Sequence, residues 1–285
     1  MTKKMCFRLL CVCLLSALLC SCSLPFGGMR VGISASEIRY ANAGDYSVGN
    51  ADLPADGIDG LEINWIAGEV TLIYDEGSTI RLSETSEQTI SENFTLRYLA
   101  DHGTLRVQYA KNGKHSFGSL QKHLTVRVPK SVLLAKVTVS TVSANLDAQN
   151  FGAGEWILKS VSGKMGISQA AVCASLSAET VSGNVSLTML GTVGTLTFQS
   201  VSATLSMSGG ITGKGIFETT SGNVFLALPH NASFAAKTDT VSGNFRCEFP
   251  TVQNGRTYTH GSGDVSLQFD TVSGDIEISG MDEPD

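Results

Sequence analysis

The sequence TVSGNV at Thr180–Val185 decides the fold, because close copies of it recur through the second half of the chain. Most copies begin with Ser or Thr, carry Ser at the third position and Gly or Ala at the fourth, and end on an apolar residue. Besides Thr180–Val185, the copies are TVSANL (Thr141–Leu146), SVSGKM (Ser160–Met165), SVSATL (Ser200–Leu205), TTSGNV (Thr219–Val224), TVSGNF (Thr240–Phe245), TVSGDI (Thr271–Ile276) and a diverged HGSGDV (His260–Val265).

The spacing of the central serines predicts a repeat architecture. These serines are Ser143, Ser162, Ser182, Ser202, Ser221, Ser242, Ser262 and Ser273. Successive members are 19, 20, 20, 19, 21, 20 and 11 residues apart. A near-constant period is typical of chains in which each unit stacks on its neighbours. The short last interval indicates an atypical terminal unit.

The residues after each motif predict strands with one buried face. Val185, Leu187 and Met189 alternate with polar residues, which is the period of a β-strand. The Ser-Gly-Asn/Asp element is typical of a turn, where Gly tolerates a positive φ. A unit of about 20 residues is too short for an ordinary strand–helix–strand crossover and fits one coil of a β-solenoid.

We therefore predict an all-β fold, a parallel β-helix or β-solenoid with an N-terminal β-rich cap. An antiparallel sandwich with evenly spaced strands is the alternative. In the solenoid, the serines form a corner ladder, hydroxyl to hydroxyl. One apolar residue per coil forms an internal ladder: Leu146, Met165, Val185, Leu205, Val224, Phe245, Val265 and Ile276.

This motif pattern resembles a bacterial family of adhesin-like proteins, also known as a domain of unknown function, in which SGD- or SGN-containing coils build a β-helix. The resemblance runs from about Gly60 to Gly280. It implies the β-helical fold and an adhesin-like role, but no established activity. Ala144 and Ala203 replace the motif glycine, and Lys164 and Thr204 replace Asn or Asp, so a shared ligand at that position is not expected.

The N-terminus predicts export. Lys3, Lys4 and Arg8 precede an apolar run at residues 9–19, which is short for a membrane span and typical of a signal peptide. The run ends in Leu19-Cys20-Ser21-Cys22, which resembles a bacterial lipobox and implies lipid attachment at Cys22. A lipid there would hold the mature protein on the membrane. A plain signal peptide and a secreted protein are the alternative.

These patterns divide the chain into five segments. We expect a lipoprotein signal peptide at 1–21, a tether at 22–56 and a capping part at 57–140. The repeat solenoid follows at 141–280, and 281–285 is an acidic tail.

The net charge argues against a nucleic-acid partner, and the positions of the cysteines argue against a disulfide. Loss of Lys3, Lys4 and Arg8 lowers the formal net charge from −6 to −9, which argues against a nucleic-acid partner. Of the seven cysteines, only Cys173 and Cys247 remain in the body. Their separation of nearly four coils, roughly 18 Å, predicts free thiols.

Catalytic and metal-binding motifs are missing from the sequence, and we expect no catalytic residue, cofactor or metal. Asp264, Asp270 and Asp275 invite comparison with the carboxylates of β-helical polysaccharide enzymes. Asp264 and Asp275 occupy the corner position of Asn184 and Asn244 and are interpreted as turn residues. The basic cluster at 111–118, with Lys122 and His123 nearby, is interpreted as a solvated loop, with contact to an acidic envelope polymer as the alternative.

The expected function is that of a lipid-anchored, extracytoplasmic envelope protein whose solenoid binds or spaces without catalysis. Its expected partners are the membrane and a cell-wall glycan or surface protein. The alternatives are a polysaccharide-active β-helix enzyme and a regulatory component of envelope-stress signalling.

Overall fold

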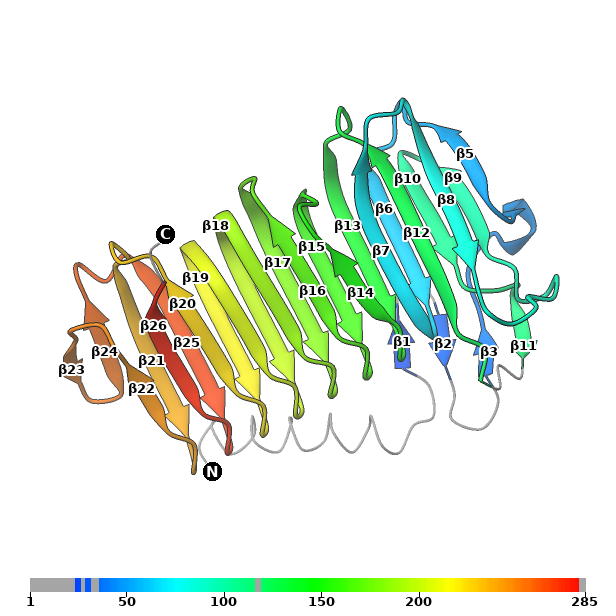
Figure 1. The fold of residues 1–285 in the computed structure, drawn as a ribbon. Coiled ribbons are helices and arrows are strands. Elements are labelled where there is room, and N and C mark those ends of the chain that lie inside the picture. The colour runs from blue at the N-terminus through cyan, green and yellow to red at the C-terminus, as the bar shows by residue number, and fades with distance from the viewer. Residues whose placement is uncertain (1–23, 27–28, 32–35, 116–118, 282–285) are drawn as a thin grey trace.

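Apolar alternation after each motif copy produces strands with a buried inner face. The computed structural model describes residues 24–26, 29–31, 36–115 and 119–281. In it Val185, Leu187 and Met189 are at most 2% exposed, while Ser186 and Thr188 between them face solvent. The strands wind into a parallel β-solenoid, as the repeat predicted (Figure 1).

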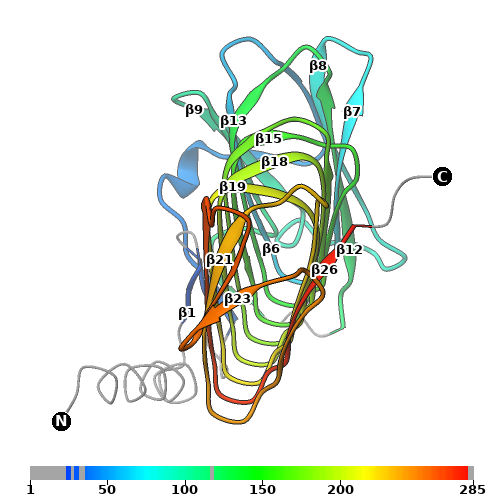
Figure 2. The ribbon, with the colours of Figure 1, turned by 90° about the vertical axis from the view of Figure 1, so that its left-hand side faces the viewer.

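Two sheets face each other across the core, and Figure 2 shows them as the two walls of the column. The first sheet contains, in spatial order, β4 (Ser47–Val48), β9 (Arg97–Asp101), β10 (Thr104–Gln108), β6 (Gly60–Trp65), β13 (Leu134–Thr141), β15 (Ala153–Ser160), β17 (Cys173–Thr180), the second halves of β18 (Val185–Ser200) and β19 (Leu205–Thr219), β25 (Val265–Thr271), β21 (Phe234–Thr240), β24 (Thr257–His260) and β23 (Val252–Asn254).

The second sheet forms the opposite wall. In spatial order it contains β5 (Ala51–Pro54), β8 (Thr79–Thr85), β12 (Lys122–Pro129), β7 (Gly68–Asp75), β14 (Asn145–Ala148), β16 (Met165–Gln169), the first halves of β18 and β19, β20 (Val224–Leu228), β26 (Ile276–Gly280) and β22 (Phe245–Cys247). Smaller elements are the hairpin of β1 (Leu24–Phe26) and β2 (Met29–Val31), the pair of β3 (Ser36–Ile38) and β11 (Gly113–His115), and a 3-10 turn at Ala43–Asp45.

The coils do not stack in chain order at either end. At the C-terminal end β25 and β26 lie between β19–β20 and β21–β22, where Figure 1 shows them in red between yellow and orange strands. At the N-terminal end β6 and β7 lie between β10–β12 and β13–β14. Each end therefore encloses one coil between two others that are distant from it in sequence.

This insertion corrects the expected apolar ladder. Ile276 pairs with both Val224 and Phe245, so it precedes Phe245 in space. Val265 does not belong to the ladder, because it lies in the first sheet opposite Phe234. The interval before Ser273 is short because Ser262 and Ser273 lie just before and just after a single strand, β25. The two strands that precede β25 are antiparallel and do not complete a coil.

Antiparallel strands cover both sheets at the N-terminal end of the column and the first sheet at the C-terminal end, where the second sheet ends on β22, parallel to β26. At the N-terminal end β9 and β8 run antiparallel to β10 and β12, with β4 and β5 outside them. At the other end β24 and β23 run antiparallel beside β21. Such strands cover parallel edges that would otherwise invite pairing with another chain. Residues 57–140, expected only as a cap, also contribute the two coils β6–β7 and β10–β12.

Candidate functional site

Seven of the motif serines line one edge of the column, where the chain passes from the first sheet to the second. Their hydroxyls donate to a backbone carbonyl of the neighbouring coil, as in Ser162 to Val142 at 3.3 Å and Ser221 to Val201 at 3.3 Å. The same contact is made by Ser143, Ser182, Ser202, Ser242 and Ser273. The expected hydroxyl-to-hydroxyl ladder is wrong, because a stacked carbonyl is the nearer acceptor.

Ser262 does not join that edge. Its hydroxyl lies 3.0 Å from that of Ser233 and donates to Asp264, at the start of β25 in the first sheet. The diverged motif copy at His260–Val265 therefore forms a different corner, which explains why its spacing to Ser273 is short.

At five motif copies the close stacking of coils leaves no room for a Cβ, whereas Ala144 and Ala203 occupy the same motif position in two other copies. A Cβ at Gly222 would lie 1.8 Å from the carbonyl oxygen of Ala203, and one at Gly274 would lie 2.0 Å from that of Gly222. Apart from Gly263, the motif glycines do not have positive φ, so the turn argument from sequence was wrong for them. The first Thr of the motif is buried and bonds the same turn, as Thr219 Oγ1 accepts from Gly222 N at 2.7 Å.

The three aspartates compared with catalytic carboxylates are not brought together. Asp264 and Asp275 lie beyond opposite ends of β25, and Asp270 accepts a hydrogen bond from Gln268. Hydrogen bonds from Ser262 and Ser233 lower the pKa of Asp264, and those from Asn244 lower the pKa of Asp275. Both carboxyls stay ionised and bonded within turns, which does not suit a general acid. Among the described residues, no three His, Cys, Asp or Glu side chains gather as a metal site.

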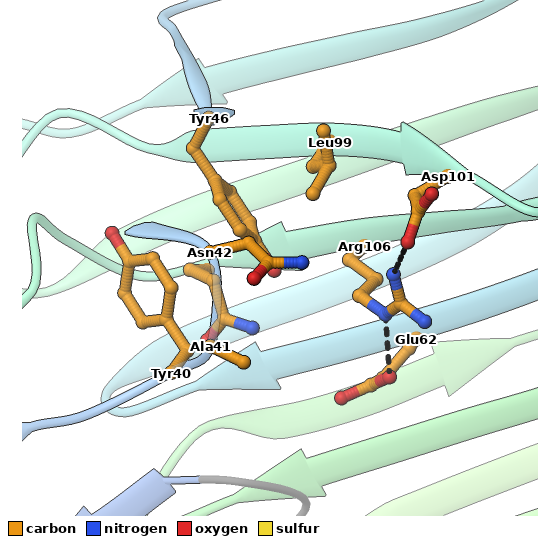
Figure 3. Close-up of a pocket in the computed structure, with 9 residues that line it drawn as sticks. Tyr40, Ala41, Asn42, Tyr46, Glu62, Leu99, Asp101 and Arg106 are labelled. Atoms are coloured by element: carbon orange, nitrogen blue, oxygen red, sulfur yellow. Dashed lines mark hydrogen bonds and ion pairs between the residues drawn. The ribbon is translucent and has the colours of Figure 1, made fainter. Parts of the chain in front are cut away.

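A pocket of about 270 Å³ lies on the outer face of the first sheet, near its N-terminal end (Figure 3). Its walls come from the segment around the 3-10 turn and from β6, β9 and β10. The lining residues are Tyr40, Ala41, Asn42, Tyr46, Glu62, Leu99, Asp101, Arg106 and Gln108. The alternation of the strands places Leu99, Arg106 and Glu62 side by side on three adjacent strands, all facing outward.

Arg106 is held between two carboxylates at one side of this pocket. Its Nη1 lies 2.9 Å from Asp101 Oδ2 and its Nε lies 3.4 Å from Glu62 Oε2, as the dashed lines in Figure 3 mark. The hydrogen bond from Arg106 lowers the pKa of Asp101. Asp101 and Arg106 are therefore charged near neutral pH, and the two ion pairs fix the orientation of the Arg106 guanidinium.

Two tyrosines form the opposite side of the pocket. The rings of Tyr40 and Tyr46 are tilted at 53° with centroids 4.6 Å apart. Tyr40 is fixed by its hydroxyl, which donates to Ala110 O and accepts from Asn112 N. Burial raises the pKa of Tyr46, and the side chain of Gln108 opposes that shift. The pocket thus offers aromatic surface facing hydrogen-bonding groups.

Lys122, expected beside a solvated loop, is fully buried in the N-terminal end of the column. Its Nζ donates to Glu84 and to the carbonyls of Phe94 and Tyr109, and it lies 4.6 Å from the ring centroid of Trp65. Burial lowers the pKa of Lys122 to about 8, against the opposing effect of Glu84. This ion pair belongs to the core and is not available to an envelope polymer.

Sequence reasoning did not find the pocket, since its residues come from four segments spread over residues 40–108. The only signal in the sequence for this pocket was the alternation of each strand, which places polar residues such as Glu62 and Arg106 on the outer face. Cys22, the expected lipid site, lies outside the described residues. Cys173 is buried in β17, Cys247 is half-buried in β22, and both are free thiols. In the described part of the chain, no helix has the length and apolar character needed to cross a bilayer.

A family model described as Toastrack DUF4097 matches residues 58–193 and 191–279. The chain belongs to this family. The resemblance drawn from the SGN and SGD motifs is thereby confirmed at the level of the family. No curated protein matches the chain significantly.

The solved structures that match the chain are remote in sequence. One, from Clostridium sporogenes, is named a "putative cell adhesion protein"; it is 10% identical with a TM-score of 0.35, and the match covers 83% of this chain and 100% of that one. A "putative adhesin" from Bacteroides fragilis is 12% identical with a TM-score of 0.40, covering 81% and 97%. A "putative lipid binding protein" from Parabacteroides distasonis is 14% identical with a TM-score of 0.33, covering 84% and 96%.

Proposed function

We propose that this Toastrack protein is a non-enzymatic, adhesin-like binding module of the bacterial cell envelope, anchored outside the cytoplasm by a lipid at Cys22. The observation that carries the proposal is the pocket between Tyr40, Tyr46 and Arg106. Its polar groups are held in place by ion pairs and hydrogen bonds, on a wall of paired strands. A preformed concave site with aromatic surface and a few fixed polar groups is the usual form of a ligand site.

The anchor rests on the sequence. Leu19-Cys20-Ser21-Cys22 follows a basic start and an apolar run, which supports cleavage before Cys22 and lipid attachment there. One acyl-modified terminus with a tether would present the column at the membrane surface.

The anchor is tested by a Cys22→Ala change, with Cys20→Ala as the matched control two residues earlier. We expect the Cys22 variant to accumulate as unprocessed precursor, as the wild type should when treated with globomycin. The Cys20 variant should mature and fractionate with membranes. Normal maturation of the Cys22 variant would contradict the anchor.

The binding role is tested by sedimentation of the protein with isolated cell envelopes. We expect wild-type protein to sediment with them in a saturable manner. Absence of saturable binding to envelopes and to their extracted glycans would contradict a binding role and leave only a spacer.

A further inference from the structure

The pocket adjoins a row of four residues, each of which has one buried side-chain atom without a hydrogen bond. The described part of the chain contains four buried side-chain atoms without a hydrogen bond: Asn64 Oδ1, Arg97 Nη1, Gln108 Oε1 and Ser140 Oγ. All four residues lie in one lateral row across β9, β10, β6 and β13, since Gln108 pairs with Arg97 and Asn64, and Asn64 pairs with Ser140. Buried polar atoms without partners are uncommon in native proteins, so their concentration in one row requires a cause.

Gln108 is the member of this row that lines the pocket. Gln108 is 1% exposed, and its side chain lies close enough to the Tyr46 hydroxyl to influence the pKa of that group. The unpaired Oε1 is an acceptor, so it is matched by a ligand that brings a hydroxyl or amide N–H. A ligand that cannot donate a hydrogen bond would forgo this gain in affinity, because Oε1 is already buried and unpaired without a ligand.

The other groups of the pocket narrow the ligand class further. The rings of Tyr40 and Tyr46, with Leu99, suit an apolar face of a ligand. Glu62 and Asp101 can accept more hydrogen bonds than Arg106 supplies, because each carboxylate has about four acceptor sites. Two carboxylates against one guanidinium leave the pocket with a formal charge of −1, which disfavours an anionic ligand.

The volume of about 270 Å³ is just below the usual range for drug-sized ligands, so the pocket suits one ring of a longer molecule. Hydroxyl donors, an apolar face and no negative charge are together the chemistry of a neutral pyranose. We propose that this pocket binds one neutral hexose or N-acetylhexosamine residue of a glycan. The inference rests on the proposed binding role and names the ligand class of that same site.

The test is isothermal titration calorimetry of the full-length protein, purified in mild detergent, with chitotetraose and maltotetraose as neutral probes. Trigalacturonate is the anionic comparison. We expect saturable binding of at least one neutral probe and at least about tenfold weaker binding of the uronate. Tighter binding of the uronate, or no binding of either neutral probe, would overturn the inference.

The site is assigned by variants. Tyr46→Ala removes aromatic surface, and Gln108→Leu replaces the unpaired acceptor by an apolar side chain of similar size. Each should weaken neutral-sugar binding by about tenfold, the effect of a lost ring contact or hydrogen bond. Tyr46→Phe keeps the ring and should retain more of the affinity than Tyr46→Ala. Tyr258→Ala is the matched control, since this tyrosine is half-buried at the other end of the column.

Thermal melting of each variant separates loss of the site from loss of the fold. Sugar binding that survives in both folded pocket variants would overturn the assignment to this pocket. If the wild-type protein binds no neutral sugar and the Tyr46→Ala variant still sediments with envelopes, this inference is overturned and the proposed function stands. Neutral-sugar binding without envelope sedimentation would instead contradict the proposed function.

Discussion

At the scale of single residues, each position of the six-residue motif has a different structural role. The first Thr is buried and bonds the turn, the Ser donates to a stacked carbonyl, and the Gly removes a collision with the neighbouring coil. The final apolar residue enters the core, as Leu205 does with no exposed surface. The positions of the motif recur equally often in the sequence, yet we expect them to differ widely in their contribution to stability.

Leu205→Asp places a carboxylate in the apolar ladder between Val185 and Val224. We expect it to lower the free energy of unfolding by about 4 kcal/mol or more, or to prevent folding. Ser202→Ala removes only an exposed 3.4 Å hydrogen bond and should cost about 0.5 kcal/mol. Urea denaturation measures both changes, and equal effects would contradict the assignment of inner and outer positions.

The buried pair of Lys122 and Glu84 predicts strong coupling. Glu84→Gln leaves the ammonium without its counter-charge and should cost about 3–5 kcal/mol. Adding Lys122→Met removes the isolated charge and should recover at least about half of that loss. Denaturation of the two single variants and the double variant measures the coupling, and additive effects would contradict it.

The same pair predicts a dependence of stability on pH. The pKa of Lys122 is about 8 in the native state, below its ordinary value of 10.5. Between these values the unfolded chain binds a proton that the native state does not, so unfolding takes up a proton and the stability rises with pH. Relative to the double variant, the wild type should gain at most about 3 kcal/mol from pH 8 to 10.5. A difference in stability that does not change with pH would contradict this.

At the scale of elements, the deciding feature is the insertion of β25 and β26 between coils that precede them in the chain. Glu218 on β19 pairs with Asp270 on β25, and Asp270 pairs in turn with Asp239 on β21. Stacking in chain order would instead have placed Glu218 beside Asp239. The two arrangements differ by one strand spacing.

This order is tested by engineered disulfides. Adjacent strands are about 4.8 Å apart, within reach of a disulfide, whereas two spacings of about 9.6 Å are not. We expect Glu218→Cys with Asp270→Cys to form the crosslink on mild oxidation, and Glu218→Cys with Asp239→Cys to remain reduced. Peptide mapping by mass spectrometry identifies the product. A crosslink only in the second pair would show stacking in chain order.

At the scale of the whole molecule, the column has a continuous core, with short antiparallel strands on both sheets at the N-terminal end and on the first sheet at the other. The central strands β15 and β17 have hydrogen-bonded neighbours on both sides. The end strands β22 and β23 have a neighbour on one side only. A stack stabilised by nearest-neighbour contacts opens most easily at its ends.

Hydrogen exchange measures this gradient. Amides of β15 and β17 should exchange more slowly than those of β22, β23 and β4, because opening the centre breaks two interfaces. Mass spectrometry at peptide resolution is sufficient. Uniform protection along the column would indicate a single cooperative unit, and faster exchange at the centre would contradict the nearest-neighbour description.

The sequence by itself determined the solenoid, its period and the inward position of residues such as Val185 and Leu205, because these depend on local alternation and on a repeated turn. The family followed from the same motifs. It did not determine the order of the end coils, because the motif at Thr271–Ile276 fits equally well against any neighbouring coil. Only the tertiary structure places Ile276 before Phe245.

The tertiary structure alone decided the pocket and the buried lysine. Tyr46, Arg106 and Gln108 are brought together by strand pairing across distant segments. The spacing of these residues in the sequence does not predict that pairing. Lys122 looked like part of a basic loop, yet the packing of Trp65 and Tyr109 around it placed it in the core. Local pattern sets which face of a strand is buried, whereas long-range contacts set which exposed groups meet.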